Sequence, residues 1–170
     1  MSWKVKVFAP PMPLAGGRII CMSAAQLTLK PGLSDGSSVT IDAAYDNKLG
    51  RVVATAVQVK RNGAGGEITT RKLHEIHIQN ALIKVVMNQM LFALDENQMT
   101  QPAAEIIDQF APAKGRPRSE TTRDAALIYT IATVANWPPL KTVADKLSVS
   151  QSTATRLVAE ARTLGMLDDG

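Results

Sequence analysis

The side chains most suited to a specific chemistry lie near the C-terminal end of the chain, in a segment that predicts a helix. From Ser150 the sequence reads SQSTATRLVAEARTLG, and its apolar residues recur at helical spacing. This spacing assigns an inward face to four residues: Ala154, Leu157, Ala161 and Leu164. The outer face of the first turns carries hydrogen-bonding groups, namely Gln151, Ser152, Thr155 and Arg156, and Thr153 is a further candidate for contact with DNA. Because Gln and Arg make paired hydrogen bonds to the edges of adenine and guanine, these side chains are candidates for reading bases in DNA.

A shorter amphipathic helix is expected just before this segment, with Val143, Ala144 and Leu147 on its inner side. Ala144 is small where two helices would cross closely, and Val149 lies in the turn, where it can fill the space between them. In a helix-turn-helix of this kind the first turns of the second helix enter the major groove. Lys141 is a further candidate for contact with DNA. The alternative is a pair of short helices in a bundle that has no nucleic-acid partner.

A basic segment, Lys114-Gly115-Arg116-Pro117-Arg118, precedes these helices. Its Gly-Arg-Pro-Arg core is similar to the AT-hook, a peptide that lies extended in the narrow minor groove of A·T-rich DNA. Proline favours the extended path, and the negative potential of that groove attracts arginine. Lys114, Arg116 and Arg118 are therefore candidates for minor-groove or phosphate contacts. The alternative is a solvated tether that adds only attraction to phosphates.

The first part of the chain, residues 1–110, predicts an α+β domain. Three strands are expected, at residues 18–30, 38–45 and 51–60. Because the loops between them are too short for parallel crossovers, we expect an antiparallel β-meander. The hydrophobic period then changes and predicts a short helix over 69–76 and a longer one over 79–94. The longer segment is apolar over most of its circumference, which suits a core helix and a dimer interface equally.

The remaining chain predicts a helical domain. Residues 111–119 form a linker that is rich in proline, glycine and basic residues, and residues 120–170 contain three helices, the first from about Thr122 to Asn136. The expected fold class is therefore α+β. It consists of an N-terminal antiparallel β-meander with helices, followed by a C-terminal all-α, tri-helical helix-turn-helix.

Composition and charge favour a globular cytoplasmic protein with a weakly basic C-terminal part. The 170 residues are 45% hydrophobic and carry a net charge of +4. Residues 111–170 hold 8 Lys/Arg against 6 Asp/Glu, and residues 1–110 hold 11 against 9, so the shorter C-terminal part is more basic per residue. Cys21 has no cysteine partner, which favours a reducing compartment. The N-terminal segment does not predict a signal peptide, and no stretch predicts a membrane span.

Motifs for catalysis and metal binding find little support, and we expect no enzyme activity, metal or cofactor. His74 and His77 lack the spacing of the HExxH zinc motif and have no third ligand nearby. Residues 63–66 are rich in glycine, yet the Gly-Lys-Ser/Thr of a phosphate-binding loop is missing. A serine recombinase also ends in a helix-turn-helix, but the N-terminal half lacks a recognisable nucleophilic serine among clustered arginines.

The arrangement of these motifs resembles the helix-turn-helix DNA-binding proteins of actinobacteria and of their phages and mobile elements. The resemblance covers about residues 41–78 and 114–167, and within the first range the sequence YDNKLGR from Tyr45 to Arg51 is similar to a turn in the N-terminal part of that family. The resemblance implies a DNA-binding regulator or accessory protein. Two positions depart from the family pattern. Gln151 stands where Arg or Lys is frequent, and Thr155-Arg156 replaces a pair that commonly contains an aromatic residue.

Two functional hypotheses follow from these observations. The first is a sequence-specific protein that binds double-stranded DNA as a homodimer, as a transcriptional regulator or a phage accessory factor. The second is an adaptor that binds a host or phage protein through the N-terminal domain, and the apolar segment 79–94 motivates it.

Overall fold

The computed structural model describes residues 2–63, 67–94 and 100–167. The strands within these residues are β1 (Ser2–Val7), β2 (Pro11–Leu14), β3 (Ile19–Met22), β4 (Ala24–Lys30), β5 (Ser38–Asp46), β6 (Arg51–Lys60), β7 (Leu91–Leu94) and β8 (Thr100–Pro102). The helices are α1 (Thr70–His74), α2 (Ile78–Val85), α3 (Ala103–Ile107), α4 (Arg118–Val134), α5 (Pro139–Leu147) and α6 (Gln151–Thr163). A 3₁₀ turn, η1 (Ala15–Gly17), and a π-helical turn, η2 (Val86–Met90), complete the set.

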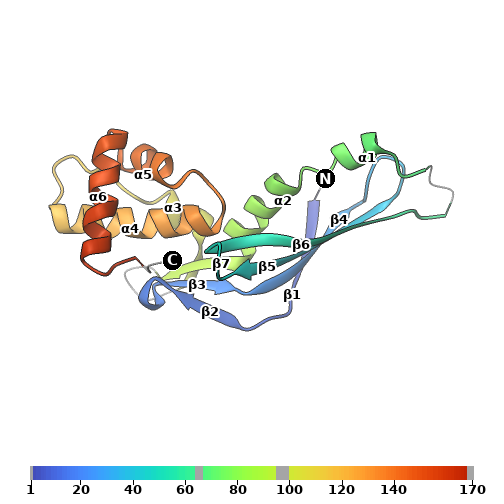
Figure 1. Ribbon diagram of the computed structural model, residues 1–170, viewed down its shortest axis with the longest axis horizontal. Coiled ribbons are helices and arrows are strands. Elements are labelled where there is room, and N and C mark those ends of the chain that lie inside the picture. The colour runs from blue at the N-terminus through green and yellow to red at the C-terminus, as the bar shows by residue number, and fades with distance from the viewer. Residues whose placement is uncertain (1, 64–66, 95–99, 168–170) are drawn as a thin grey trace.

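Two antiparallel sheets organise the N-terminal part of the molecule. One has the strand order β1-β4-β5-β6 and the other the order β2-β3-β7-β8. Because β1 pairs with β4 and β2 pairs with β3, the chain up to Lys30 forms a bent hairpin whose two arms each enter both sheets. In Figure 1 the far ends of β4, β5 and β6 lie with α1 at one end of the molecule, and α4, α5 and α6 lie at the other.

The strands β4, β5 and β6 form the meander that the sequence predicts. Along β5, Val39, Ile41 and Ala43 are buried and alternate with partly exposed residues, as expected for a sheet with one covered face. The single strand expected over 18–30 is wrong, because the chain leaves one sheet after β3 and enters the other at β4. The strands β1 and β2 are not predicted by the pattern. Both lie at sheet edges, where the prolines of β2 are tolerated.

The prediction of one helix over 79–94 is also wrong. α2 ends at Val85, η2 follows, and Leu91–Leu94 is the strand β7, which pairs with β3 and β8. Val85, Val86 and Met90 are all buried, so the apolar side chains of this run pack inside their own chain, while its polar residues, such as Lys84 and Asn88, are exposed. Periodicity cannot distinguish helix from strand in such a continuous apolar run. The short helix predicted over 69–76 is confirmed as α1.

The thiol of Cys21 lies in the hydrophobic core. Cys21 on β3 is fully buried, and burial raises the pKa of its thiol to about 12. Because a thiol with so high a pKa stays neutral, Cys21 acts as a small apolar core residue.

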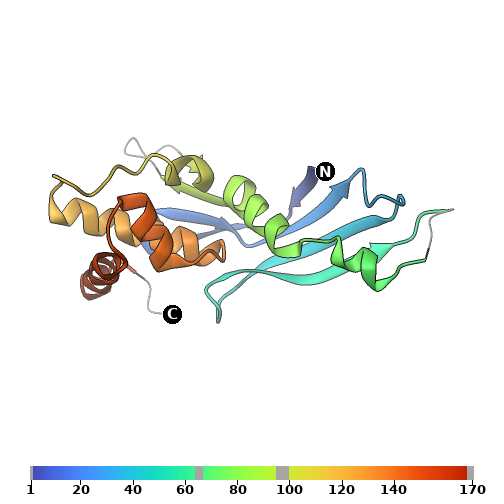
Figure 2. The same cartoon turned by 90° about the horizontal axis from the view of Figure 1, so that it is seen from above.

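The three C-terminal helices α4, α5 and α6 pack against one another, and α4 also contacts α3 and β6. Viewed from above, α2 lies over the strands, between α1 toward one end of the molecule and the C-terminal helices at the other (Figure 2). The first of these helices begins at Arg118 rather than Thr122 and ends at Val134 rather than Asn136. Within the part of the chain that the structure describes, no helix combines the length and apolarity that a membrane crossing requires.

Candidate nucleic-acid interface

A tight turn joins α5 to α6. Ser148 adopts left-handed backbone angles with φ of 52°, and the N–H of Val149 donates to the carbonyl oxygen of Ala144 at 3.0 Å. The hydroxyl of Ser150 accepts a hydrogen bond from the N–H of Thr153 at 3.2 Å and so caps α6. Val149 is partly buried against the core. The turn hydrophobe and the serine cap that the sequence predicts are therefore confirmed.

The inner face of α6 is buried against α4 and α5. Three of the four residues predicted to face inward are buried, namely Ala154, Leu157 and Ala161. The prediction is wrong for Leu164, which is 57% exposed because α6 ends one residue before it, at Thr163. Leu167 packs into the core in its place.

The outer face of α6 begins with side chains that project into solvent. Gln151, Ser152, Thr155 and Arg156 are exposed, whereas Thr153 is partly buried at the cap. Their hydrogen bonds stay within the first turns of this segment. Thr155 Oγ1 donates to the carbonyl oxygen of Gln151 at 2.9 Å, and Arg156 Nη2 donates to Thr153 Oγ1 at 3.4 Å. Among the described residues, no carboxylate lies within ion-pair distance of Arg156. These groups can therefore meet a ligand without first breaking contacts to another helix.

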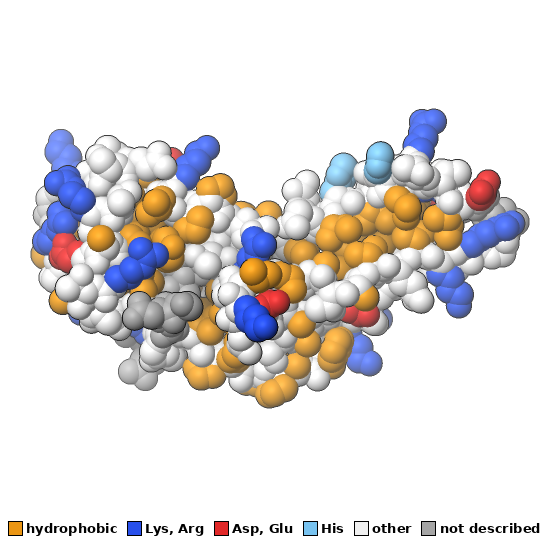
Figure 3. Space-filling view, in the orientation of Figure 1, with side chains coloured by type: hydrophobic (Ala, Val, Ile, Leu, Met, Phe, Trp, Pro, Cys, Tyr) orange, Lys and Arg blue, Asp and Glu red, His pale blue; other side chains and the backbone are white. Residues whose placement is uncertain are grey.

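Two further residues predicted to contact DNA are exposed lysines. Lys141 lies near the start of α5, and Lys114 lies in the segment before α4. Neither forms an ion pair with a carboxylate in the described ranges. On the face shown in Figure 3, the end of the molecule formed by α4, α5 and α6 carries several Lys and Arg side chains and little acidic surface. Such a surface attracts phosphates without regard to sequence.

The two arginines of the basic segment do not lie on an extended arm. α4 begins at Arg118, so the linker predicted over 111–119 ends inside a helix. Arg116 forms an ion pair with Asp124 at 2.8 Å, and Arg118 forms one with Glu160 at 2.7 Å. The prediction of an extended minor-groove peptide is therefore wrong for this conformation, because carboxylates of α4 and α6 hold both guanidinium groups against the helices.

The rest of this segment is fastened to α5, so it is not a free tether either. The N–H of Ala113 donates to the carbonyl oxygen of Leu147 at 2.9 Å. On the preceding turn Asp108 Oδ1 forms an ion pair with Lys146 Nζ at 2.6 Å. These two contacts with α5 hold the segment that leads into α4 in place.

Glu160 is a structural residue that the sequence analysis missed. One of its oxygens, Oε2, accepts hydrogen bonds from Arg118 Nε at 2.9 Å and Nη2 at 2.7 Å. The other, Oε1, accepts one from the hydroxyl of the buried Thr122 at 3.1 Å. The hydrogen bond from Arg118 is the main reason that the pKa of Glu160 lies below its ordinary value. Glu160 thus ties α6 to the first turns of α4.

We expect Glu160→Gln to lower the free energy of unfolding at neutral pH, because the neutral amide loses the charged pair with Arg118. The folded-state pKa of Glu160 lies below the unfolded value, so its stabilisation is complete above about 4.5 and is lost as the pH falls toward the folded-state pKa. The difference between the two proteins in urea unfolding should therefore shrink as the pH is lowered. Glu75→Gln, at an exposed glutamate after α1, is the control. A difference that stays constant with pH would contradict the assignment.

The histidines considered as metal ligands lie at the other side of the molecule. His74 is the last residue of α1 and His77 immediately precedes α2, and both are exposed. Across the described residues, no three His, Cys, Asp or Glu side chains are grouped so that they could hold a metal ion.

Comparison with known proteins adds no family to this geometry. The chain matches no protein-family model, no curated protein and no solved structure.

Proposed function

We propose that this protein binds double-stranded DNA sequence-specifically, with α5 and α6 as its helix-turn-helix and the start of α6 in the major groove. The observation that carries the proposal is the outer face of α6, whose first turns present Gln151, Ser152, Thr155 and Arg156 to solvent. The opposite face of the same helix is buried. A helix held in this way can enter a groove as a rigid body.

Each exposed group has a role in this proposal. Gln151 and Arg156 make paired hydrogen bonds to adenine and guanine edges, and Ser152 and Thr155 contact bases or nearby phosphates. Lys141 and Lys114 bind phosphates. Arg116 acts through its ion pair with Asp124 and positions the start of α4. Arg118 is 55% exposed in its side chain and can face a phosphate while it remains paired with Glu160.

A regulator of this kind reads a site of two half-sites when it acts as a homodimer. In that arrangement two copies of α6 lie about 34 Å apart, one turn of B-DNA. The N-terminal sheets then supply the contact between the copies. Sedimentation equilibrium of the full chain measures the mass of the particle in solution and so tests for a dimer. A symmetric sequence in the selected DNA would also support a dimer.

The decisive test is selection of genomic fragments by the purified protein at two salt concentrations. A recurrent motif that survives the higher salt is expected, because base contacts do not depend on counterion release. Arg156→Ala should weaken binding to that motif by about 1–3 kcal/mol and relax discrimination at one base pair.

Arg71→Ala removes the same charge from an exposed position on α1 and is the matched control. It should leave the affinity unchanged. The proposal fails if the wild-type protein enriches no motif and its binding collapses with salt. Equal losses in Arg156→Ala and Arg71→Ala would reject the placement of α6 in the groove.

An adaptor function is the second candidate, although the observation that first motivated it no longer applies. Most apolar side chains of the segment 79–94, among them Leu82, Val85 and Met90, are buried inside their own chain and are not available to a partner. What favours this function now is apolar surface elsewhere on the N-terminal part, including Phe8, which is 58% exposed. A pull-down after nuclease treatment that recovers one stoichiometric protein supports this candidate, and recovery of DNA-dependent material alone counts against it.

A further inference from the structure

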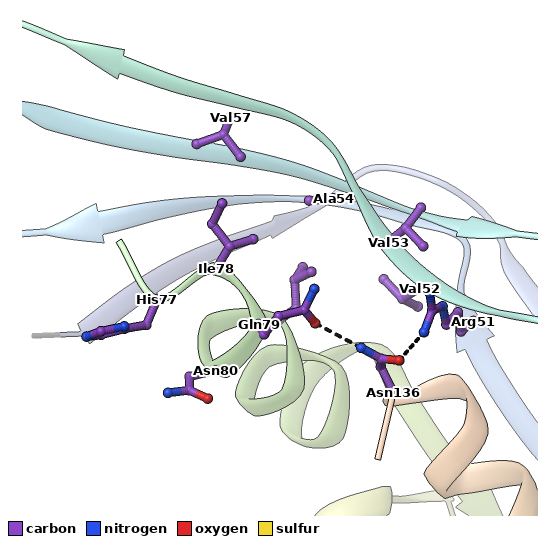
Figure 4. Close-up of a pocket in the computed structure, with 11 residues that line it drawn as sticks. Arg51, Val52, Val53, Ala54, Val57, His77, Ile78, Gln79, Asn80 and Asn136 are labelled. Atoms are coloured by element: carbon purple, nitrogen blue, oxygen red, sulfur yellow. Dashed lines mark hydrogen bonds between the residues drawn. The ribbon is translucent and has the colours of Figure 1, made fainter. Parts of the chain in front are cut away.

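A cleft of about 670 Å³ opens between β6, the start of α2 and the end of α4. It lies apart from the outer face of α6. Its wall is formed by apolar side chains, among them Val52, Val53, Val57, Ile78 and Leu82. Its polar groups are Arg51, His77, Gln79, Asn80 and Asn136, and Figure 4 shows them around the apolar part. Small-molecule sites combine an apolar lining of this kind with a few convergent polar groups, in clefts of about 300–1,000 Å³.

Three of the polar groups meet at one end of the cleft and come from three different elements. Arg51 at the start of β6 donates a hydrogen bond through Nη1 to Asn136 Oδ1. Asn136 Nδ2 in turn donates to Gln79 Oε1 of α2 at 2.9 Å. Figure 4 draws both bonds across the end of the cleft. Asn136 itself has left-handed backbone angles, with φ of 59°, in the connection from α4 to α5.

The charge of Arg51 is not neutralised within the described part of the chain. Among the described residues, no carboxylate lies within ion-pair distance of its guanidinium group. The guanidinium group instead donates to the neutral side-chain amide of Asn136. The cleft residues include no aspartate or glutamate. A partly buried guanidinium group beside amide groups matches a carboxylate, which it can bind through two parallel hydrogen bonds.

We propose that this cleft binds a small monocarboxylate with an apolar body. The carboxylate meets Arg51 and the amide groups of Asn136 and Gln79, and the apolar body lies along Val57 and Ile78. The apolar wall selects against small inorganic anions, because such an ion loses its hydration there and gains only the contact with Arg51. The charged end selects against neutral apolar compounds, which leave Arg51 without a counter-charge.

Occupancy of the cleft has a consequence for the C-terminal helices. A carboxylate that accepts a hydrogen bond from Nη1 of Arg51 competes with Asn136 Oδ1 for that nitrogen. Asn136 stands just before α5, so its bonds to Arg51 and Gln79 help to hold the α4–α5 connection against the N-terminal part. The acid therefore acts as an effector that shifts the helices relative to the sheets. This regulatory step rests on the proposed DNA binding, whereas the binding of the acid does not.

Binding is tested without DNA, by nuclear magnetic resonance titration of the full chain with octanoate, benzoate and phenylacetate. Octanamide, benzamide and phenylacetamide are the neutral controls. We expect at least one acid to bind with Kd of about 1 mM or tighter, its amide to bind about tenfold more weakly, and the side-chain amide signals of Gln79 and Asn136 to shift. If none of the acids binds, or if acid and amide bind equally, the proposal is overturned.

Variants locate the bound acid. Arg51→Gln removes the charge and leaves a shorter neutral polar side chain, and we expect about tenfold weaker binding of the acid. Lys60→Gln makes the same charge change at the exposed far end of β6 and should leave binding unchanged. Val57→Asp places a carboxylate on the wall at a position that is 40% exposed and tolerates a polar group, so it should abolish binding even if Arg51→Gln fails to fold. If Val57→Asp, or a folded Arg51→Gln, binds the acid with the affinity of the wild-type protein, the assignment of the acid to this cleft is overturned.

Coupling to DNA is measured separately on the selected motif. We expect saturating acid to change DNA affinity by about fivefold or more, within the usual range of allosteric coupling, and Arg51→Gln to remove this response. An unchanged DNA affinity overturns the regulatory step. If the protein binds no DNA at all, the proposed function fails. The titration with the acids still tests whether the cleft binds a carboxylate, because it does not involve DNA.

Discussion

Leu157→Ala is expected to lower the free energy of unfolding by about 2–5 kcal/mol, the usual cost of emptying a leucine site in a packed core. The side chain of Leu157 is 1% exposed and lies on the inner face of α6. Because α6 is held against α4 and α5 through this face, a cavity there also loosens the helix that we propose enters DNA. A domain is stable by only about 5–15 kcal/mol, so the loss is a large fraction of the total.

The same helix offers a matched control. Leu164→Ala makes the identical chemical change at a position that is 57% exposed, where we expect less than about 0.5 kcal/mol. Urea unfolding followed by circular dichroism measures both variants, and DNA affinity follows on the same samples. Equal destabilisation of the two variants, or a larger effect at Leu164, would contradict the packing of α6.

Gly32→Ala is expected to cost about 1–3 kcal/mol, because the loop between β4 and β5 has no room for a side chain there. Gly32 has φ of 111°, a value that L-residues rarely adopt, and a Cβ atom would lie 2.7 Å from the carbonyl oxygen of Ser37. That oxygen accepts the hydrogen bond from the N–H of Leu33 at 2.9 Å, so relief of the clash disturbs the loop closure.

Gly36→Ala in the same loop separates the clash from the backbone strain. Gly36 also has positive φ, 80°, but nothing lies within 4 Å of its Cβ position. We therefore expect Gly36→Ala to destabilise the protein by less than Gly32→Ala in parallel thermal and urea unfolding. A larger effect at Gly36 would show that the clash is relieved without cost.

This loop matters beyond its own residues because it anchors α1. Asp35 accepts hydrogen bonds from the N–H and the hydroxyl of Ser37, and it forms an ion pair with Lys72 of α1 at 2.5 Å. The hydrogen bond from Lys72, with those from Ser37, lowers the pKa of Asp35 to about 2. A distortion of the loop at Gly32 should therefore also weaken the contact between Asp35 and Lys72 of α1.

Local signals in the sequence were sufficient for elements whose determinants lie within a few residues. The strands β5 and β6, the serine cap of α6 and the turn hydrophobe Val149 were all predicted and are confirmed. The turn after Tyr45 is similarly local, because Asp46 Oδ1 accepts the N–H groups of Lys48 and Leu49 at 2.8 and 3.0 Å.

The division of the sheets was decided by tertiary structure. Residues 18–30 have one continuous strand pattern, yet the chain passes from β3 in one sheet to β4 in the other. Residues 91–94 continue an apolar helical pattern, yet they form β7 because β3 and β8 provide backbone partners on both sides. Backbone pairing between distant segments leaves no mark on local periodicity.

The charges of the candidate interface show the same division. The sequence by itself determined which residues in the first turns of α6 face outward, because a helix with one apolar face has only one orientation against a core. It could not determine which arginines are free. Arg118 of α4 is paired with Glu160, 42 residues away, whereas Arg156 of α6 forms no ion pair with a described carboxylate. The meeting of Arg51, Gln79 and Asn136 was likewise decided only by the fold, because hydrogen bonds between elements depend on packing that no local pattern encodes.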